Sequence, residues 1–311
     1  MTTLAIVVPC YNEEAVLPET SRRLREQLGS LRSEGLAADD SAIYFVDDGS
    51  SDKTWALIEQ LAGEHREVHG IKLSRNRGHQ NALIAGMFTA EGDVVISVDA
   101  DLQDDLNAMN DMLRAHHAGS DIVYGVRRNR DTDDAFKRSS ALGYYRLLSL
   151  LGVDVVHNHA DYRLLSRRVV EALREYGESN LFLRGIIPQL GFNSAIVHYD
   201  RARRFAGESK YPLKRMIAFA LQGVTSFSAA PLRAITLLGT LVALASLGGG
   251  FWVLFERLWN SKVVPGWAST VLPIFFLGGV QMLCLGVIGE YVAKIYMETK
   301  RRPRYIIDRT I

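Results

Sequence analysis

The chain has 311 residues, of which 48% are hydrophobic, and a formal net charge of +1. This length allows one large domain with an appended segment, and a net charge so close to zero argues against nucleic acid as a bulk electrostatic partner. The two cysteines, Cys10 and Cys284, lie far apart in apolar runs, which excludes a disulfide framework and favours a reducing compartment for the N-terminal part.

The N-terminal apolar run, residues 4–8, is too short for a signal sequence and leads directly into Pro9, so we interpret it as a strand. Comparable β-branched runs then alternate with helical patterns. Strands are expected at residues 4–8, 43–47, 68–73, 93–98 and 121–124, and helices at residues 14–31, 53–63, 80–90 and 106–118. This alternation predicts an α/β fold with a mainly parallel sheet and helices on both faces.

Polar clusters follow the first four expected strands. They are PCYNEE at residues 9–14, DDGSSD at 47–52, SRNRGHQN at 74–81 and DADLQD at 99–104. Ligands of a parallel sheet bind beyond the carboxyl ends of its strands, so these clusters predict one composite site.

Two of these clusters have a local alternative. The D-x-D pair Asp99 and Asp101, with the amide of Gln103, is the oxygen-rich group that hard divalent cations bind while they keep water and substrate phosphates. Such a pair also occurs in ordinary solvated turns. The cluster DDGSSD is equally typical of a turn in which Ser50, Ser51 or Asp52 caps the following helix.

Two uncharged segments near the C-terminus predict a transmembrane hairpin. Between Arg233 and Glu256 lie 22 residues without a charge, and between Lys262 and Glu290 lie 27. Each is long enough to cross a hydrocarbon core of roughly 30 Å at about 1.5 Å per residue. Basic residues gather on the flank opposite the tryptophans, so both termini are expected on the cytoplasmic side. A buried hairpin in a soluble core is the alternative.

These patterns divide the chain into three parts. We expect a cytoplasmic domain over residues 1–228, a transmembrane hairpin over 229–298 with spans at about 234–256 and 268–290, and a cytoplasmic tail over 299–311. Basic amphipathic segments at 136–151 and 212–227 predict helices in the lipid headgroup layer, with ordinary surface helices as the alternative. The glycine-rich spans allow close helix contacts, and we expect a homo-oligomer in the cytoplasmic membrane.

The motifs VVPCYNEE, VDDGSSD, RNRG and VDADLQD, in this order, resemble the family-2 glycosyltransferases of the Rossmann-like GT-A fold. The similarity continues through ADYRLLSRR (residues 160–168), the RG at 184–185, RRFAGESKY (203–211) and the two expected spans. This fuller set resembles the polyisoprenyl-phosphate glycosyltransferases, relatives of dolichol-phosphate mannose synthase, and especially the bacterial members that use undecaprenyl phosphate. The resemblance covers essentially the whole chain.

This resemblance implies an enzyme that transfers one sugar, with inversion, from a nucleotide-sugar to a polyprenyl phosphate at the cytoplasmic membrane face. A UDP-hexose is favoured over a GDP-sugar, and the sugar itself is left open. Transfer to another lipid, such as a diacylglycerol or ceramide, is the nearest alternative. A non-catalytic scaffold or carrier of sugar-lipids is the alternative from a different class.

The resemblance also assigns roles to residues of the donor side. Asp99, Asp101 and Gln103 match the family's positions for Mg²⁺ or Mn²⁺, and Asp101 is counted as catalytic through the ion. Asp48 is the first choice for binding the base or ribose, and Asp47 is the second choice. The expected nucleotide-sugar site comprises Pro9, Tyr11, Glu13, Asp47, Asp48, Asn76, Gly78, Asp99, Ala100 and Arg127.

The acceptor side follows from the same resemblance. Asp161 matches the family's proposed catalytic base, although a phosphomonoester is already largely anionic at neutral pH, so Asp161 can equally orient groups or balance charge. Arg138 and the loop residues Arg204, Ser209 and Lys210 are expected to bind the acceptor phosphate.

Overall fold

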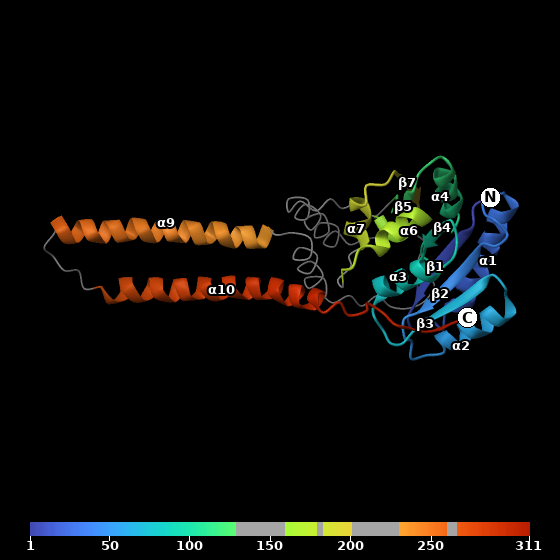
Figure 1. Cartoon of the computed structure of the whole chain (residues 1–311), viewed down its shortest axis with the longest axis horizontal. Helices are drawn as coiled ribbons and strands as arrows, with labels where there is room; N and C mark the ends of the chain where they lie inside the picture. The colour runs from blue at the N-terminus through green and yellow to red at the C-terminus, as the bar shows by residue number, and fades with distance from the viewer. Residues whose placement is uncertain (129–158, 179–182, 201–229, 260–265) are drawn as a thin grey trace. The chain divides into compact units, whose positions relative to one another are not determined.

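The computed structural model describes residues 1–128, 159–178, 183–200, 230–259 and 266–311 (Figure 1). The described residues up to Asp200, together with Arg302–Ile311, belong to one compact unit. The remaining described residues belong to a second unit. The amphipathic segments 136–151 and 212–227 lie outside the described residues.

The first unit is built on a sheet whose described strands have the order β7-β5-β6-β4-β1-β2-β3-β8. Pairing is parallel between β1 and both β2 and β4, between β2 and β3, and between β5 and β7, whereas β6 and β8 run antiparallel to their neighbours. The strands are β1 Leu4–Cys10, β2 Ala42–Asp47, β3 Val68–Leu73, β4 Val94–Ser97, β5 Ile122–Arg127, β6 His159–Ser166, β7 Ser194–Tyr199 and β8 Ile307–Thr310. The predicted mainly parallel sheet is confirmed.

The central strands carry apolar residues on both faces, and helices cover both faces of the sheet and bury them. Alternate residues of β1, such as Leu4 and Ile6, join the core formed with α1 (Leu17–Ser33), α2 (Thr54–Glu64) and α4 (Ala108–His117). The opposite face of β1 contacts α3 (His79–Thr89), where Gly86 lies directly against Val7. Two shorter helices, α6 (Arg167–Arg174) and α7 (Leu183–Gln189), complete the described part of the unit. The result is the α/β layering that the sequence predicted.

Three of the described strands, β6, β7 and β8, were not among those expected, and β7 pairs parallel with β5. β6 is inserted antiparallel between β4 and β5, so the segment 121–124 does not continue the parallel order directly after β4. β8 lies in the segment expected as a tail and pairs with β3, where Gly70 and Ile311 exchange backbone hydrogen bonds of 3.0 and 2.9 Å.

The second unit contains two long helices, α9 (Ala230–Trp259) and α10 (Trp267–Thr299), which contact each other. Within the described residues, one stretch, Phe276–Thr299, is long and apolar enough to cross a membrane, with a mean hydropathy of 1.5. The expected hairpin of two transmembrane helices is therefore not confirmed, although both helices are present.

Candidate active site

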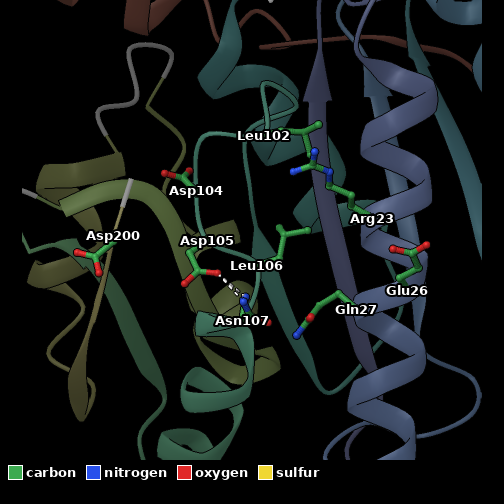
Figure 2. Close-up of a pocket in the computed structure, with 9 residues that line it drawn as sticks. All are labelled: Arg23, Glu26, Gln27, Leu102, Asp104, Asp105, Leu106, Asn107 and Asp200. Atoms are coloured by element: carbon green, nitrogen blue, oxygen red, sulfur yellow. Dashed lines mark hydrogen bonds between the residues drawn. The ribbon is translucent and has the colours of Figure 1, made fainter. Parts of the chain in front are cut away.

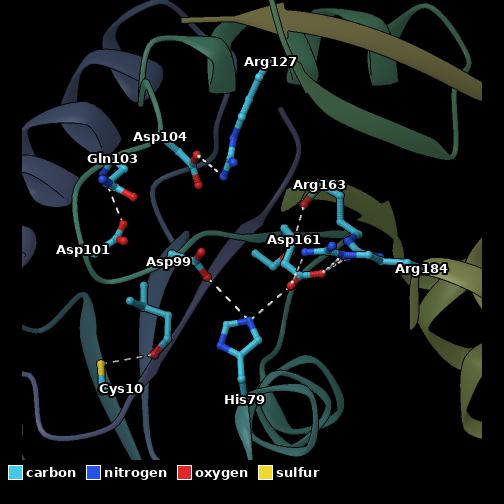
Figure 3. A network of polar contacts seen from close by, with 12 residues as sticks. Cys10, His79, Asp99, Asp101, Gln103, Asp104, Arg127, Asp161, Arg163 and Arg184 are labelled. Atoms are coloured by element: carbon cyan, nitrogen blue, oxygen red, sulfur yellow. Dashed lines mark hydrogen bonds and ion pairs between the residues drawn. The ribbon is translucent and has the colours of Figure 1, made fainter. Parts of the chain in front are cut away.

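Several strand ends converge at one edge of the sheet. β1, β2, β3 and β4 are mutually parallel, so the polar clusters that follow them meet at their carboxyl ends. β6 runs the other way, with Arg163 opposite Ser97 of β4. The amino end of β6 therefore reaches this edge and brings Asp161 beside Asp99 (Figure 3).

The loop after β3 is held by Asp48. Its two carboxylate oxygens accept the backbone N–H groups of Arg77 and Gly78 at 2.7 and 2.8 Å. Gly49, at a φ of 68°, lies so close to this loop that a side chain would collide with the backbone nitrogen of Asn76. Asp48 thus acts as the anchor of the loop that leads into α3.

Asp47 is fully buried and turns the chain after β2. One of its carboxylate oxygens accepts the N–H of Ser50 at 3.1 Å. The other is buried and has no hydrogen-bond partner among the described residues. A turn is therefore present in DDGSSD, while the structure leaves one buried acceptor of Asp47 unsatisfied.

The loop after β4 is shaped by local contacts. Thr20 of α1 donates a hydrogen bond to the carbonyl oxygen of Ala100 at 2.8 Å, and the N–H of Gln103 donates to Asp101 at 3.2 Å. Leu102 has a φ of 57°, an uncommon conformation for a residue other than glycine. Burial raises the pKa of Asp99 to about 6; the carboxylates of Asp104, Asp161 and Asp101 add to this effect, and His79 opposes it.

Asp161 lies at the centre of a cluster of basic side chains. Arg163, which is fully buried, donates a hydrogen bond to it, and Arg184 makes a two-point contact at 3.2 and 3.3 Å. His79 Nε2 lies 3.5 Å from an oxygen of Asp161 and also 3.5 Å from an oxygen of Asp99. Burial alone would raise the pKa of Asp161, but the contacts with His79, Arg163 and Arg184 hold it well below its usual range.

Arg127, at the end of β5, points toward Asp104 (Figure 3). Its guanidinium lies 3.7 Å from that carboxylate, which also accepts a hydrogen bond from the hydroxyl of Tyr199 at 2.6 Å.

Beside the loop that follows β4, a pocket of about 540 Å³ opens toward α1 (Figure 2). It is lined by Arg23, Glu26, Gln27, Leu102, Asp104, Asp105, Leu106, Asn107 and Asp200. Four carboxylates make this pocket unsuited to a phosphate group.

Comparison with known proteins identifies the family. Residues 5–174, more than half of the chain, match Glycosyl transferase family 2. The Uncharacterized glycosyltransferase YkoT of Bacillus subtilis (strain 168) is 52% identical over 98% of this chain and 91% of that protein. The chain belongs to glycosyl transferase family 2.

Other relatives of this family 2 glycosyltransferase have more specific names. The Prophage bactoprenol glucosyl transferase homolog of Escherichia coli (strain K12) is 38% identical over 98% of this chain and 98% of that protein. Among solved structures, the mannosyltransferase PcManGT from Pyrobaculum calidifontis, in complex with GDP-Man and Mn²⁺, has a TM-score of 0.47 at 17% identity, over 94% of this chain and 87% of that chain.

The residues expected to bind the nucleotide-sugar lie around the same sheet edge of the glycosyltransferase. Pro9 is within β1, Tyr11 is half exposed, and the N–H of Glu13 donates to Thr54 at 2.9 Å. Asn76 is exposed next to the loop that Asp48 anchors. Arg138, Arg204, Ser209 and Lys210, expected to bind the acceptor phosphate, lie outside the described residues.

Three residues of this site were not among the predicted ones. His79, Arg163 and Arg184 surround Asp161, yet sequence reasoning did not assign them a role. The available signal was their position: Arg163 and Arg184 stand within ADYRLLSRR and the RG at 184–185, which carry the family resemblance, and His79 directly follows RNRG in the polar cluster SRNRGHQN. Their shared contact with Asp161 depends on the pairing of β6 with β4, which the sequence pattern does not indicate.

The carboxylates of the glycosyltransferase do not form a complete metal cage. Within the described ranges, no group of three or more His, Cys, Asp or Glu side chains is arranged to hold a metal ion. Asp99 and Asp101 are both partly exposed and stand in one short loop with Gln103. An ion at this loop would therefore need further ligands from water or substrate.

Proposed function

We propose that this glycosyltransferase transfers a single sugar from a nucleotide-sugar, with UDP as the favoured nucleotide, to a polyprenyl phosphate. Full-length similarity to proteins named bactoprenol glucosyl transferase supports the acceptor class and makes glucose the first sugar to test. The observation that carries the proposal is the convergence of the Asp99–Gln103 loop and Asp161 at one sheet edge. The oxygen-rich loop Asp99–Gln103 thus lies beside the basic side chains that surround Asp161.

A divalent cation, Mg²⁺ or Mn²⁺, fits the donor set of this loop. Asp99 and Asp101 supply carboxylate oxygens and Gln103 an amide oxygen, which are ligands that hard cations prefer. The absence of a closed cage among the described residues agrees with an ion that keeps positions for phosphates and water. When bound, such an ion neutralises the charge that grows on the departing nucleoside diphosphate.

The nucleotide would bind at the carboxyl ends of β1 and β2. Tyr11 offers an exposed ring for stacking, and Asp47, whose second oxygen is buried without a partner among the described residues, is the further proposed contact of the base or ribose. Asp48 supports this site by holding the loop at Arg77 and Gly78, and each of its oxygens can accept a second hydrogen bond, so contact of Asp48 with the base or ribose stays part of the proposal. Asn76, Gly78 and Ala100 line the same edge in this proposal, and Arg127 stands next to the ion-binding loop through Asp104.

Asp161 serves in this mechanism as a fixed negative charge. Two arginines and His79 hold its carboxylate, and its lowered pKa makes it a poor proton acceptor at neutral pH. A phosphate acceptor does not require a base, since its oxygen is already largely anionic. A single displacement by that oxygen would invert the anomeric centre. A neutral lipid hydroxyl, by contrast, would need a base that Asp161 is poorly suited to provide.

Attachment to the cytoplasmic membrane would bring the acceptor to the site. The apolar stretch Phe276–Thr299 supports such attachment, and a span within α9 completes the two-span topology that we propose. Arg138, Arg204, Ser209 and Lys210 remain our proposed ligands of the acceptor phosphate. We also retain the proposal of a homo-oligomer through glycine-rich helices.

The test is product formation by the full chain in detergent micelles. Purified protein is incubated with undecaprenyl phosphate, Mn²⁺ and a panel of UDP- and GDP-sugars, and both nucleoside diphosphate and labelled sugar-lipid are measured. We expect both products with one donor and no product with diacylglycerol or ceramide. Product with a neutral lipid alone would refute the acceptor assignment, and no product with any donor would refute the enzymatic proposal.

A further inference from the structure

His79 occupies a bridging position between the two halves of the site. Its Nε2 atom lies 3.5 Å from Asp99 on one side and 3.5 Å from Asp161 on the other. Figure 3 shows the imidazole between these two carboxylates, with Arg163 and Arg184 on the far side of Asp161. The proposed mechanism uses His79 as one of three groups that hold Asp161, but gives no role to its contact with Asp99.

The position of His79 is fixed from two directions. The preceding residue, Gly78, is tied to Asp48 by its N–H at 2.8 Å. The following residue, Gln80, accepts the N–H of Leu183 at 3.4 Å with its side-chain oxygen, and Leu183 is the neighbour of Arg184. His79 therefore begins α3 at a point anchored both to the donor-side loop and to the element that carries Arg184.

The two carboxylates that contact His79, Asp99 and Asp161, differ in how many other cationic partners they have. Asp161 is already held by Arg163 and Arg184, so it does not depend on His79 for compensation of its charge. Asp99 has His79 as its one ion-pair partner among the described residues. A divalent cation attracts a carboxylate more strongly than an imidazole does and repels an imidazolium. An ion entering at Asp99 would therefore displace His79 from that carboxylate.

We propose that His79 is a positioning residue that couples the binding of a divalent cation at Asp99 to the placement of Asp161. Without the ion, the imidazole bridges the two carboxylates. With the ion on Asp99, the imidazole pairs with Asp161 alone and completes its cationic shell. This inference rests on the proposed function, because it requires that Asp99 binds the ion.

Metal binding tests the competition directly and does not depend on turnover. The full chain in detergent micelles is titrated with Mn²⁺ at about pH 8, well above the usual pKa of a carboxylate, and free Mn²⁺ is measured by electron paramagnetic resonance. The variants are His79→Leu, which removes the contact, and His79→Gln, which keeps an N–H donor of similar reach. His198→Leu, at an exposed histidine of β7, is the matched control.

The expected result is tighter Mn²⁺ binding when the competitor is removed. Since a partly exposed ion pair is a weak interaction, His79→Leu should lower the Kd for Mn²⁺ by about two- to fivefold. His79→Gln should fall between His79→Leu and the wild type, and His198→Leu should equal the wild type. Equal or weaker Mn²⁺ binding in His79→Leu would overturn the competition while leaving the metal site of the proposed function intact. Failure of the wild type to bind Mn²⁺ would overturn both proposals.

Kinetics test the second half of the coupling. His79→Leu should lower kcat and leave the KM for the donor nearly unchanged, because Asp161 loses a partner while the nucleotide loop stays anchored by Asp48. His79→Gln should restore part of kcat. A purely structural role would instead lower the thermal midpoint and raise KM together, with no rescue by glutamine. That pattern, or an unchanged kcat in His79→Leu, would overturn the positioning role.

Discussion

Arg163 and Asp161 lie two residues apart on β6, and the fully buried guanidinium of Arg163 donates a hydrogen bond to the carboxylate of Asp161. Two other nitrogens of Arg163 are buried without a hydrogen-bond partner in the described part of the chain. A buried cation of this kind is costly unless its charge is compensated. Asp161 is thus required by the core of the domain as well as by the site.

Replacing Asp161 by asparagine should therefore affect stability and turnover together. Asp161→Asn leaves the buried charge of Arg163 without its anion, and removing one member of a buried pair costs about 3–5 kcal/mol. We expect a lower thermal midpoint, slow sugar transfer and retained nucleotide affinity. The double variant Asp161→Asn/Arg163→Met should recover most of the stability and none of the turnover, because it removes the buried charge. A single variant as stable as the wild type would contradict the buried ion pair.

Asp101→Ala should abolish turnover and weaken metal-dependent nucleotide binding without unfolding the domain. Asp101 is partly exposed in a surface loop, so its loss costs the proposed ion a ligand and leaves the core unchanged. UDP affinity with and without Mn²⁺, measured by calorimetry, checks this. Asp111→Ala, which removes an exposed carboxylate of α4, is the control and should behave as the wild type. Full activity of Asp101→Ala would refute the metal assignment.

Asp48→Asn distinguishes a loop anchor from a residue that contacts the base. An asparagine offers one acceptor oxygen where Asp48 offers two, so either Arg77 or Gly78 loses its N–H partner. A fully buried unsatisfied N–H costs about 1–3 kcal/mol, and these partly buried groups fall at the lower end of that range. We expect a lower thermal midpoint together with UDP binding about tenfold weaker. Weaker UDP binding at an unchanged thermal midpoint would show instead that Asp48 contacts the nucleotide directly.

The ion pair between Asp121 and Arg168 should make stability depend on acid pH. Burial would raise the pKa of Asp121, but hydrogen bonds from Arg168 and Ser166 outweigh it and lower the pKa. A carboxyl whose pKa is lowered by folding stabilises the fold above its unfolded pKa of about 3.9, and this contribution is lost as pH falls through the folded value. The thermal midpoint of the wild type should exceed that of Asp121→Asn at neutral pH, and the difference should shrink below about pH 4. A difference that stays constant to lower pH would contradict the lowered pKa.

The parallel centre of the sheet was predictable because its signal is local. β1, β2 and β4 are buried on both faces, which leaves nearly continuous apolar runs in the sequence. β6 and β8 lack such a signal. In β6, with the sequence HADYRLLS, Asp161 and Arg163 interrupt the apolar residues. β8 is the short polar segment IDRT, which becomes a strand because the edge of β3 is available to it.

By itself, the sequence determined the α/β class, the family and the position of the acidic residues Asp99 and Asp101 directly after a strand, because short motifs and residue periodicity carry this information. Only the tertiary structure decided what surrounds Asp161. Its partners His79, Arg163 and Arg184 come from three separate segments, and they meet because β6 runs antiparallel beside β4. Contacts between residues so far apart along the chain depend on strand order and direction, which no local pattern specifies.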